Sequence, residues 1–289
     1  MYQTRLSGPV IGFVLMILLL VLLFALHRPA ARPQIAPRIA PPWAISQPFA
    51  PAGADQPAAP AQDPAVPLIA GGYLTVVNPE AVYGEAEQPV LTQEVEQALA
   101  YVIGRSGHSP QGPITAVIEP QADCLLNGMA YTDERRIHVY TCADIPRQRA
   151  VNVLAHEFVH QLAHDHYGDA HLHADLALSE GLATWGAGRY WLGQHADFAT
   201  FVRQVYINHD EELLPLATHY HGRSINDMNK LYYEWASFVE YLLLTYDQAP
   251  FDALYVSGQG DPGSANYTGV YGKSLEQLEQ EWRTWLIHS

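Results

Sequence analysis

The segment HEFVH, at residues 156–160, has the residue types and the spacing of a metal site. On a helix, residues four positions apart share one face, so His156 and His160 can bind one ion together. Glu157 follows the first histidine, where its carboxylate can contact a water on the metal without binding the metal itself. The pattern predicts a zinc site with Glu157 as the general base. The alternative, in a chain with 14 histidines, is a chance pattern on an ordinary amphipathic helix.

A third candidate ligand is Glu180, in the segment SEGLATW at residues 179–185. If two antiparallel helices are joined by a short loop, this glutamate can return over the HEFVH helix. Two histidines and one glutamate, with a fourth position left open, form a known catalytic zinc set. The residues that share its helical face are small enough for the two helices to approach closely: Ala177, Thr184 and Ala187. The alternative is a solvated surface carboxylate.

HEFVH followed by SEGLATW resembles the peptidase MA-like group of gluzincins, zinc peptidases related to thermolysin in their metal site. The segments YEWASFVEYLLLTY and YGKSLEQLEQEWRTWL are similar to the later helices of that group, so the resemblance covers residues from about 85 to about 287. It implies a zincin-like fold, zinc as cofactor, a peptide or protein as substrate, catalytic Glu157, and the ligands His156, His160 and Glu180. Thr184 departs from the pattern, because thermolysin-like enzymes often carry an acidic residue there to support the first histidine. That support must come from elsewhere.

A gluzincin also needs a donor that stabilises the oxyanion, and the resemblance implies a downstream tyrosine or histidine. In the helix expected over residues 229–246, Tyr233 points away from the apolar stripe and is our candidate. The alternative is a tyrosine that only faces water.

Four more histidines crowd the segment between the two ligand helices: His164, His166, His171 and His173. A second metal site and a zinc-loading shuttle are both compatible with this composition. We expect the simpler arrangement, a solvated loop near the mouth of the active site.

The sequence predicts that the strands come first along the chain and that most of the helices follow them. Strands are expected at 73–77 and 113–119 and in a hairpin around Asp133 and Glu134; helices are expected at 91–104, at 146–165 and over most of the chain beyond 175. This order predicts an α+β fold, with a small N-terminal sheet, a zinc-binding helix and a mostly helical C-terminal half, rather than alternating βαβ units. The hairpin brings Cys124 and Cys142 nearly opposite each other, which predicts a disulfide, a bond typical of oxidising compartments. The alternative is two unrelated buried thiols.

The N-terminal region carries a targeting signal. Residues 9–26 are apolar and uncharged, and about 18 helical residues nearly span a ~30 Å hydrocarbon core. We expect a short flank at 1–8, a transmembrane signal anchor at 9–26, a Pro/Ala-rich linker at 27–69 and a metallopeptidase domain at 70–289. The alternative to the anchor is a cleaved signal peptide. The linker and the expected disulfide favour a single-pass membrane protein with an extracytoplasmic catalytic domain, although basic residues after the apolar segment favour the opposite orientation.

The formal net charge is −15, which argues against nucleic acid as a partner, because nucleic-acid binding needs a basic surface. The function that we expect is zinc-dependent hydrolysis of peptide bonds. Two other classes stay open: a catalytically silent zincin-fold binding or scaffold domain at the membrane, and a metal-handling protein that uses the histidine-rich segment. The presence of Glu157 favours chemistry, since a scaffold has no need of a general base.

Overall fold

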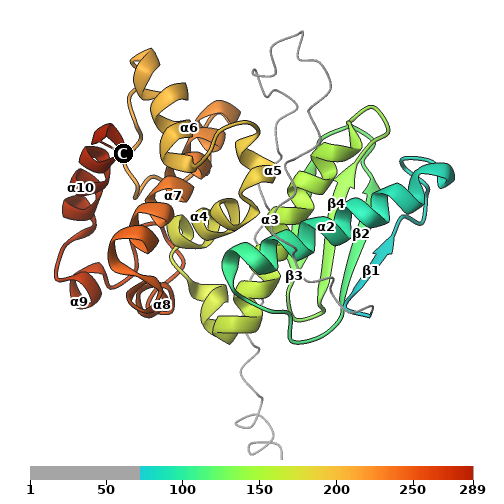
Figure 1. Cartoon of the computed structure of the whole chain (residues 1–289), viewed down its shortest axis with the longest axis horizontal. Coiled ribbons are helices and arrows are strands. Elements are labelled where there is room, and N and C mark those ends of the chain that lie inside the picture. Colours follow the sequence, from blue (N-terminus) through green and yellow to red (C-terminus); the bar gives the residue numbers. More distant parts are fainter. Residues whose placement is uncertain (1–71, 289) are drawn as a thin grey trace, which may run out of the picture. The chain divides into compact units, whose positions relative to one another are not determined.

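A computed structural model describes residues 72–288, and Figure 1 shows how their strands and helices are arranged. The strands are β1 (Leu74–Val77), β2 (Ile114–Pro120), β3 (Asn127–Tyr131) and β4 (Arg136–Thr141). They form one sheet in the order β1-β2-β4-β3. β2 is parallel to both β1 and β4, whereas β3 and β4 are antiparallel. β3 therefore lies at one edge of the sheet.

Most of the helices follow the sheet along the chain, as the sequence predicted. Their bounds are η1 (Glu85–Glu87), α2 (Gln88–Ser106), α3 (Arg147–Tyr167), η2 (Gly168–His173), α4 (Leu176–Ala187), α5 (Arg189–Leu192), α6 (Phe198–Val205), η3 (Ile207–His209), α7 (Ile225–Tyr246), α8 (Gln248–Tyr255), α9 (Tyr267–Tyr271) and α10 (Leu275–His288). The α+β class with a small sheet and a helical C-terminal half is confirmed within residues 72–288.

One detail of the predicted topology is wrong. β1, α2 and β2 form a βαβ unit, because β1 and β2 pair in parallel and α2 makes the crossover between them. Parallel neighbours need such a long connection, whereas the antiparallel pair β3 and β4 needs only a short turn. The sequence prediction had excluded βαβ units of this kind.

α3 is held in place by apolar contacts on several sides. It packs against α2, β3 and β4 on the sheet side and against α4 on the other, and α4 in turn packs against α7. In Figure 1, α3 and α4 accordingly lie between the sheet and the C-terminal helices. The side chains that α3 contributes to the core are fully buried and recur at helical spacing: Val151, Leu154, Phe158 and Leu162.

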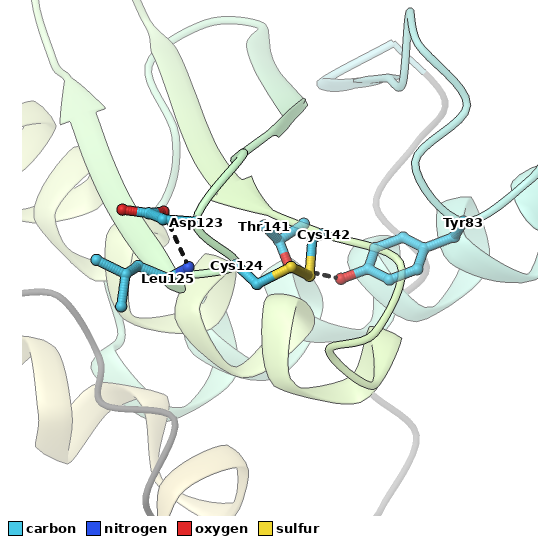
Figure 2. Close-up of a disulfide and its surroundings, with 6 residues drawn as sticks. All are labelled: Tyr83, Asp123, Cys124, Leu125, Thr141 and Cys142. Atoms are coloured by element: carbon cyan, nitrogen blue, oxygen red, sulfur yellow. Dashed lines mark hydrogen bonds between the residues drawn. A yellow bond between two sulfur atoms is a disulfide. The ribbon is translucent and has the colours of Figure 1, made fainter.

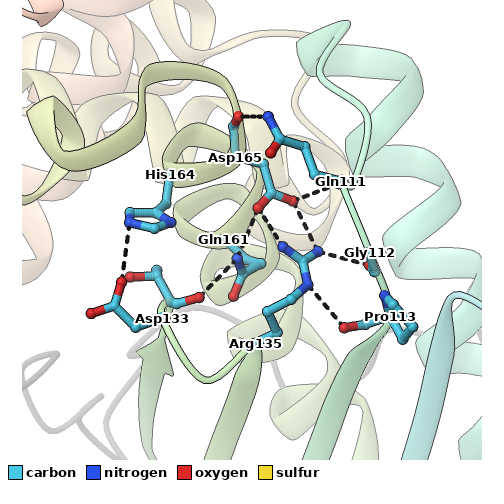
Figure 3. Close-up of polar contacts among 9 residues, drawn as sticks. Gln111, Gly112, Pro113, Asp133, Arg135, Gln161, His164 and Asp165 are labelled. Atoms are coloured by element: carbon cyan, nitrogen blue, oxygen red, sulfur yellow. Dashed lines mark hydrogen bonds and ion pairs between the residues drawn. The ribbon is translucent and has the colours of Figure 1, made fainter.

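A polar cluster attaches the C-terminal part of α3 to the sheet (Figure 3). The guanidinium of Arg135, in the β3–β4 turn, donates to both carboxylate oxygens of Asp165, at 2.5 and 3.0 Å, and to the carbonyls of Gly112 and Pro113. Asp165 also accepts from the backbone N–H of Gln111. The backbone of Arg135 has a φ of 54°, a left-handed conformation that a non-glycine residue adopts at a cost, so its side-chain bonds help to hold the turn.

The predicted disulfide between Cys124 and Cys142 is confirmed (Figure 2). The two Cα atoms lie 5.1 Å apart, and the bond joins the segment before β3 to the residue after β4. Beside it, the hydroxyls of Tyr83 and Thr141 hydrogen-bond at 3.0 Å. The bond therefore closes the open end of the β3–β4 hairpin, opposite its turn.

Replacing both cysteines by serine is expected to lower the free energy of unfolding by about 3 kcal/mol, because the bond closes a loop whose ends are 18 residues apart. Urea titration of the oxidised protein and of the double variant measures the difference. Reduction of the wild type should reproduce the loss. Equal midpoints for the variant and the oxidised wild type would contradict the prediction.

The predicted single-pass membrane location has to be corrected. Among residues 72–288, no helix combines the length and the apolar character that crossing a bilayer requires. The longest helices, α3 and α7, carry charged residues within their length, such as Glu157, Asp165, Lys230 and Glu234. The predicted flank, anchor and linker at 1–8, 9–26 and 27–69 lie outside the described residues.

Candidate metal centre

The three predicted ligands converge at one point. His156 and His160 lie on successive turns of α3, and Glu180 comes from α4. Nε2 of His156 lies 3.2 Å from Oε2 of Glu180 and 3.2 Å from Nε2 of His160, and His160 lies 3.5 Å from Glu180. All three side chains are buried or nearly so, and one ligand atom from each lies within 4.8 Å of the other two. Two imidazoles and one carboxylate in this arrangement suit a zinc ion.

Glycines let α4 approach its two neighbours closely. A Cβ on Gly186 would lie 2.7 Å from a methyl of Val159 in α3, and a Cβ on Gly181 would lie 2.7 Å from the backbone carbonyl of Trp235 in α7. Any larger residue at either position would push α4 away. Because Glu180 directly precedes Gly181 on α4, these contacts help to set its distance from the histidines of α3.

The start of α4 is fixed by a buried aspartate. Asp175 caps the helix by accepting from the backbone N–H of Ala177 at 3.0 Å. The same carboxylate accepts from the N–H of Ala265 and from the hydroxyl of Tyr267, both at 3.0 Å. The start of α4, which carries Glu180 one turn later, is thus held against the loop before α9 and against Tyr267, the first residue of α9.

Thr184 stands beside the first histidine. Its Oγ1 lies 3.4 Å from Nδ1 of His156, the ring nitrogen that faces away from the other two ligands. The sequence analysis had left the support of His156 to another residue, because thermolysin-like enzymes, which the motif resembles, often carry an acidic residue where this chain has Thr184. The structure instead places Thr184 itself at that nitrogen. An uncharged hydroxyl makes the imidazole a weaker base than a carboxylate would, which weakens metal binding.

For His156 and Glu180, burial and neighbouring groups favour the protonation states of metal ligands. Burial lowers the pKa of His156 to about 4, so this imidazole is neutral at pH 7. Burial opposes ionisation of Glu180, but the charge of His160 and the hydrogen bonds from both histidines hold its pKa well below the usual range. Neutral imidazole and ionised carboxylate are the forms that bind a cation.

Glu157 is buried beside the ligands, and its Oε1 has no hydrogen-bond partner among the described residues. Burial raises its pKa to about 7; the charge of His160 opposes this shift and that of Glu180 adds to it. A carboxylate with a pKa near neutrality suits proton transfer in both directions. The edge strand β3 passes close by, since a Cβ on Gly128 would lie 2.6 Å from Oε1. Only glycine leaves room for this carboxylate.

The fifth predicted site residue, Tyr233, has its contacts elsewhere. Its hydroxyl donates to the carbonyl of Trp191 at 3.0 Å, and its ring stacks on Phe201 with a centroid distance of 3.9 Å. The neighbouring tyrosine, which the sequence reasoning missed, faces the ligands: the ring of Tyr232 lies 5.8 Å from that of His156. Burial and the charge of Glu180 raise the pKa of Tyr232 well above its ordinary value. A role for Tyr233 as oxyanion donor stays a prediction, and Tyr232 is the better placed candidate.

The histidine-rich segment is not the solvated loop that we expected. It forms the last turn of α3 and the 3-10 helix η2, and His171 is buried. His166 stacks on His108 at a centroid distance of 4.1 Å, and His173 is exposed. Helical hydrogen bonding therefore orders this segment, while His166 and His173 stay exposed to solvent.

A second group of candidate ligands comes together near the sheet, namely Cys124, Cys142 and Asp144. The two sulfur atoms of this group are bonded to each other, so neither is available as a thiolate ligand. Within residues 72–288, the group formed by His156, His160 and Glu180 is therefore the one suited to a resident metal.

Comparison with protein-family models, with curated proteins and with solved structures finds no match to this chain. The chemistry of the centre is therefore argued from its own residues and geometry.

Proposed function

We propose that the chain is a zinc-dependent peptidase of the gluzincin type with a zincin-like fold. The observation that carries the proposal is the position of Glu157 beside three convergent ligands. Its Oε1 is buried without a hydrogen-bond partner among the described residues, and its carboxylate is close enough to His160 and Glu180 for their charges to shift its pKa. A purely structural metal site has no use for a second carboxylate that is not a ligand, because closed sites fill all positions with ligands.

In this proposal a zinc ion supplies a Lewis acid that polarises the scissile carbonyl and lowers the pKa of water. His156, His160 and Glu180 hold it. Oε1 of Glu157 takes the proton from the attacking water and then passes it to the nitrogen of the leaving amine. The pKa of about 7 allows both halves of this transfer near neutral pH. Tyr232, or Tyr233 after rearrangement, donates to the oxyanion.

The edge strand supports a peptide as the substrate. Among the described residues β3 pairs with β4 alone, so its other edge offers backbone groups for pairing with an extended chain. Because Gly128 of β3 lies against Glu157, a peptide added to that edge would run past the general base.

Metal analysis combined with peptide digestion tests the proposal on the full chain. We expect about one zinc ion per chain, cleavage of a random peptide library, loss of cleavage after chelation and recovery on addition of zinc. Zinc bound at full stoichiometry without any cleavage would instead identify a catalytically silent domain. A chain that binds no zinc would refute the proposed metal centre.

A further inference from the structure

The disulfide and a neighbouring carboxylate form a compact group at the open end of the β3–β4 hairpin. One ligand atom from each of Cys124, Cys142 and Asp144 lies within 4.8 Å of the other two. The cysteines join the segment before β3 to the residue after β4 (Figure 2), and Asp144 lies in the turn that leads into α3. Two segments of the chain thus bring two sulfur atoms and one carboxylate oxygen to the same place.

The group is within reach of the solvent. Both cysteines are half-buried and Asp144 is exposed. Among residues 72–288 the carboxylate of Asp144 makes no hydrogen bond or ion pair. A reductant can therefore reach the two sulfur atoms, and an ion can reach all three donors, without any opening of the core.

The spacing of the two cysteines fits a shared ion. Their Cα atoms lie 5.1 Å apart. With Zn–S bonds of about 2.3 Å, two thiolates in a tetrahedral site lie roughly 3.8 Å from each other. Once the disulfide is open, the two sulfur atoms have to move apart by roughly 2 Å relative to an ordinary S–S bond. A small rotation of each side chain about its Cα–Cβ bond supplies this movement, so the backbone of the hairpin can stay in place.

We propose that reduction of the Cys124–Cys142 bond turns this end of the hairpin into a metal site, in which two thiolates and the carboxylate of Asp144 bind one thiophilic divalent ion such as Zn²⁺. A dithiol reductant supplies two electrons: the S–S bond breaks, two thiols form, and the dithiol becomes a cyclic disulfide. The ion then replaces the two thiol protons, which pass to water. Thiolates are soft ligands that favour zinc over magnesium or calcium, and water fills the fourth position.

A bound ion would replace one cross-link by another. Cys124 has a φ of 53°, a left-handed conformation that is costly for a residue other than glycine, so its place in the hairpin depends on being held. The same end of the hairpin carries β3, in which Gly128 lies against Glu157. The ion therefore keeps β3 closed against β4 when the disulfide is open.

The test uses the full chain, reduced with a phosphine that is then removed under nitrogen, and Cd²⁺ as the probe. Cadmium bound to thiolate absorbs in the ultraviolet by charge transfer from sulfur. The group formed by His156, His160 and Glu180 contains no sulfur, so an ion bound there gives no such band. We expect the band to reach its maximum at one Cd²⁺ per reduced chain, to disappear when Zn²⁺ displaces the probe, and to be absent from the oxidised chain.

Two variants and a matched control identify the ligands. A lost ligand weakens the Kd for Cd²⁺ at least as much as a lost outer partner does, so we expect about a hundredfold for Cys142→Ser and about tenfold or more for Asp144→Asn. The control is Asp123→Asn. Its Oδ1 accepts from the N–H of Leu125, a bond that an amide oxygen keeps, and its side chain points away from the sulfur atoms in Figure 2. Its Kd stays at the wild-type value, because a screened surface charge that is not a ligand contributes little.

A reduced wild type without the band, or with one Cd²⁺ shared between two chains, would overturn the inference. Equal Kd values for Asp144→Asn and Asp123→Asn would do the same, because the site would then lack its third ligand. Circular dichroism follows the fold, and a reduced chain that unfolds and is not refolded by the metal also refutes the site. The inference does not rest on the proposed function: zinc at the other centre is measured by elemental analysis of the oxidised chain, and its absence there leaves this site standing.

Discussion

Glu157→Gln is expected to keep zinc at near the wild-type stoichiometry and to lower peptide hydrolysis by about 10² or more, the effect of losing a general base. Glutamine has nearly the same size, so the space between α3 and Gly128 stays filled. Its amide cannot accept the proton of the attacking water at neutral pH. Zinc content by elemental analysis and cleavage of one defined peptide measure the two quantities on the same sample.

Glu180→Ala is the matched variant, and it should behave differently. It removes one of the three ligand side chains, so zinc content and activity fall together, and added zinc restores part of both. Glu134→Gln, at an exposed position in the β3–β4 turn, serves as the control and leaves both unchanged. The mechanism would be wrong if Glu157→Gln lost its zinc as fully as Glu180→Ala, or if it kept wild-type activity.

Asp165→Ala is expected to lower the free energy of unfolding by about 1.5–3 kcal/mol, the usual net contribution of a hydrogen bond to a charged group. The carboxylate is only 3% exposed, and its loss leaves the N–H of Gln111 without its acceptor and the guanidinium of Arg135 bonded only to the carbonyls of Gly112 and Pro113. Urea titration measures the change. The matched control is Glu134→Gln, which alters an exposed carboxylate in the same turn. Equal midpoints for Asp165→Ala and the control would contradict the structural role of the cluster.

Two further comparisons identify what the cluster contributes. Arg135→Gly removes the ion pair but relieves the left-handed backbone, so it should cost less than Arg135→Ala, which keeps that backbone under strain. The second comparison follows the stability of the wild type and of Asp165→Ala as the pH is lowered. Burial raises the pKa of Asp165, but Arg135 and the other hydrogen bonds outweigh it and lower that pKa below its ordinary 3.8. The contribution is therefore complete above about pH 4 and is lost as the pH falls through the folded-state value, so the wild type and Asp165→Ala converge in stability at acid pH.

Two of the three candidate ligands were predicted to lie together from sequence because their spacing is local. His156 and His160 are four residues apart on one helix, so they share a face of α3 whatever that helix packs against, and the five residues HEFVH are enough to predict it. Glu180 needed one more assumption, an antiparallel return of α4, and the structure confirms it through the distances to both histidines. The disulfide was predictable for a similar reason, since a hairpin aligns the residues at its open end.

The hydrophobic pattern of α7 did not predict which of Tyr232 and Tyr233 faces the candidate metal centre. The sequence reasoning assigned Tyr233 to an outward face of α7, on the assumption that this helix has one buried stripe. In the structure every residue from Lys230 to Leu242 is buried, because α4, α6, α8 and α10 surround the helix. A helix that is buried all round carries no periodic signal of which residue faces which neighbour. Only the packing of α7 against α4 decides that Tyr232 lies toward the metal centre.

The sequence by itself identified the candidate ligands and the candidate general base, and it predicted the hairpin and the α+β class, because these follow from residue chemistry and from contacts within one or two neighbouring elements. Tertiary structure alone decided that Thr184 stands at His156, that β1 and β2 pair in parallel, and that His171 is buried between His160 and His164. Each of these relations joins residues on different elements, or depends on how an element is rotated against its neighbour. Spacing along one chain cannot determine that rotation, because it is set by close packing among all the elements at once.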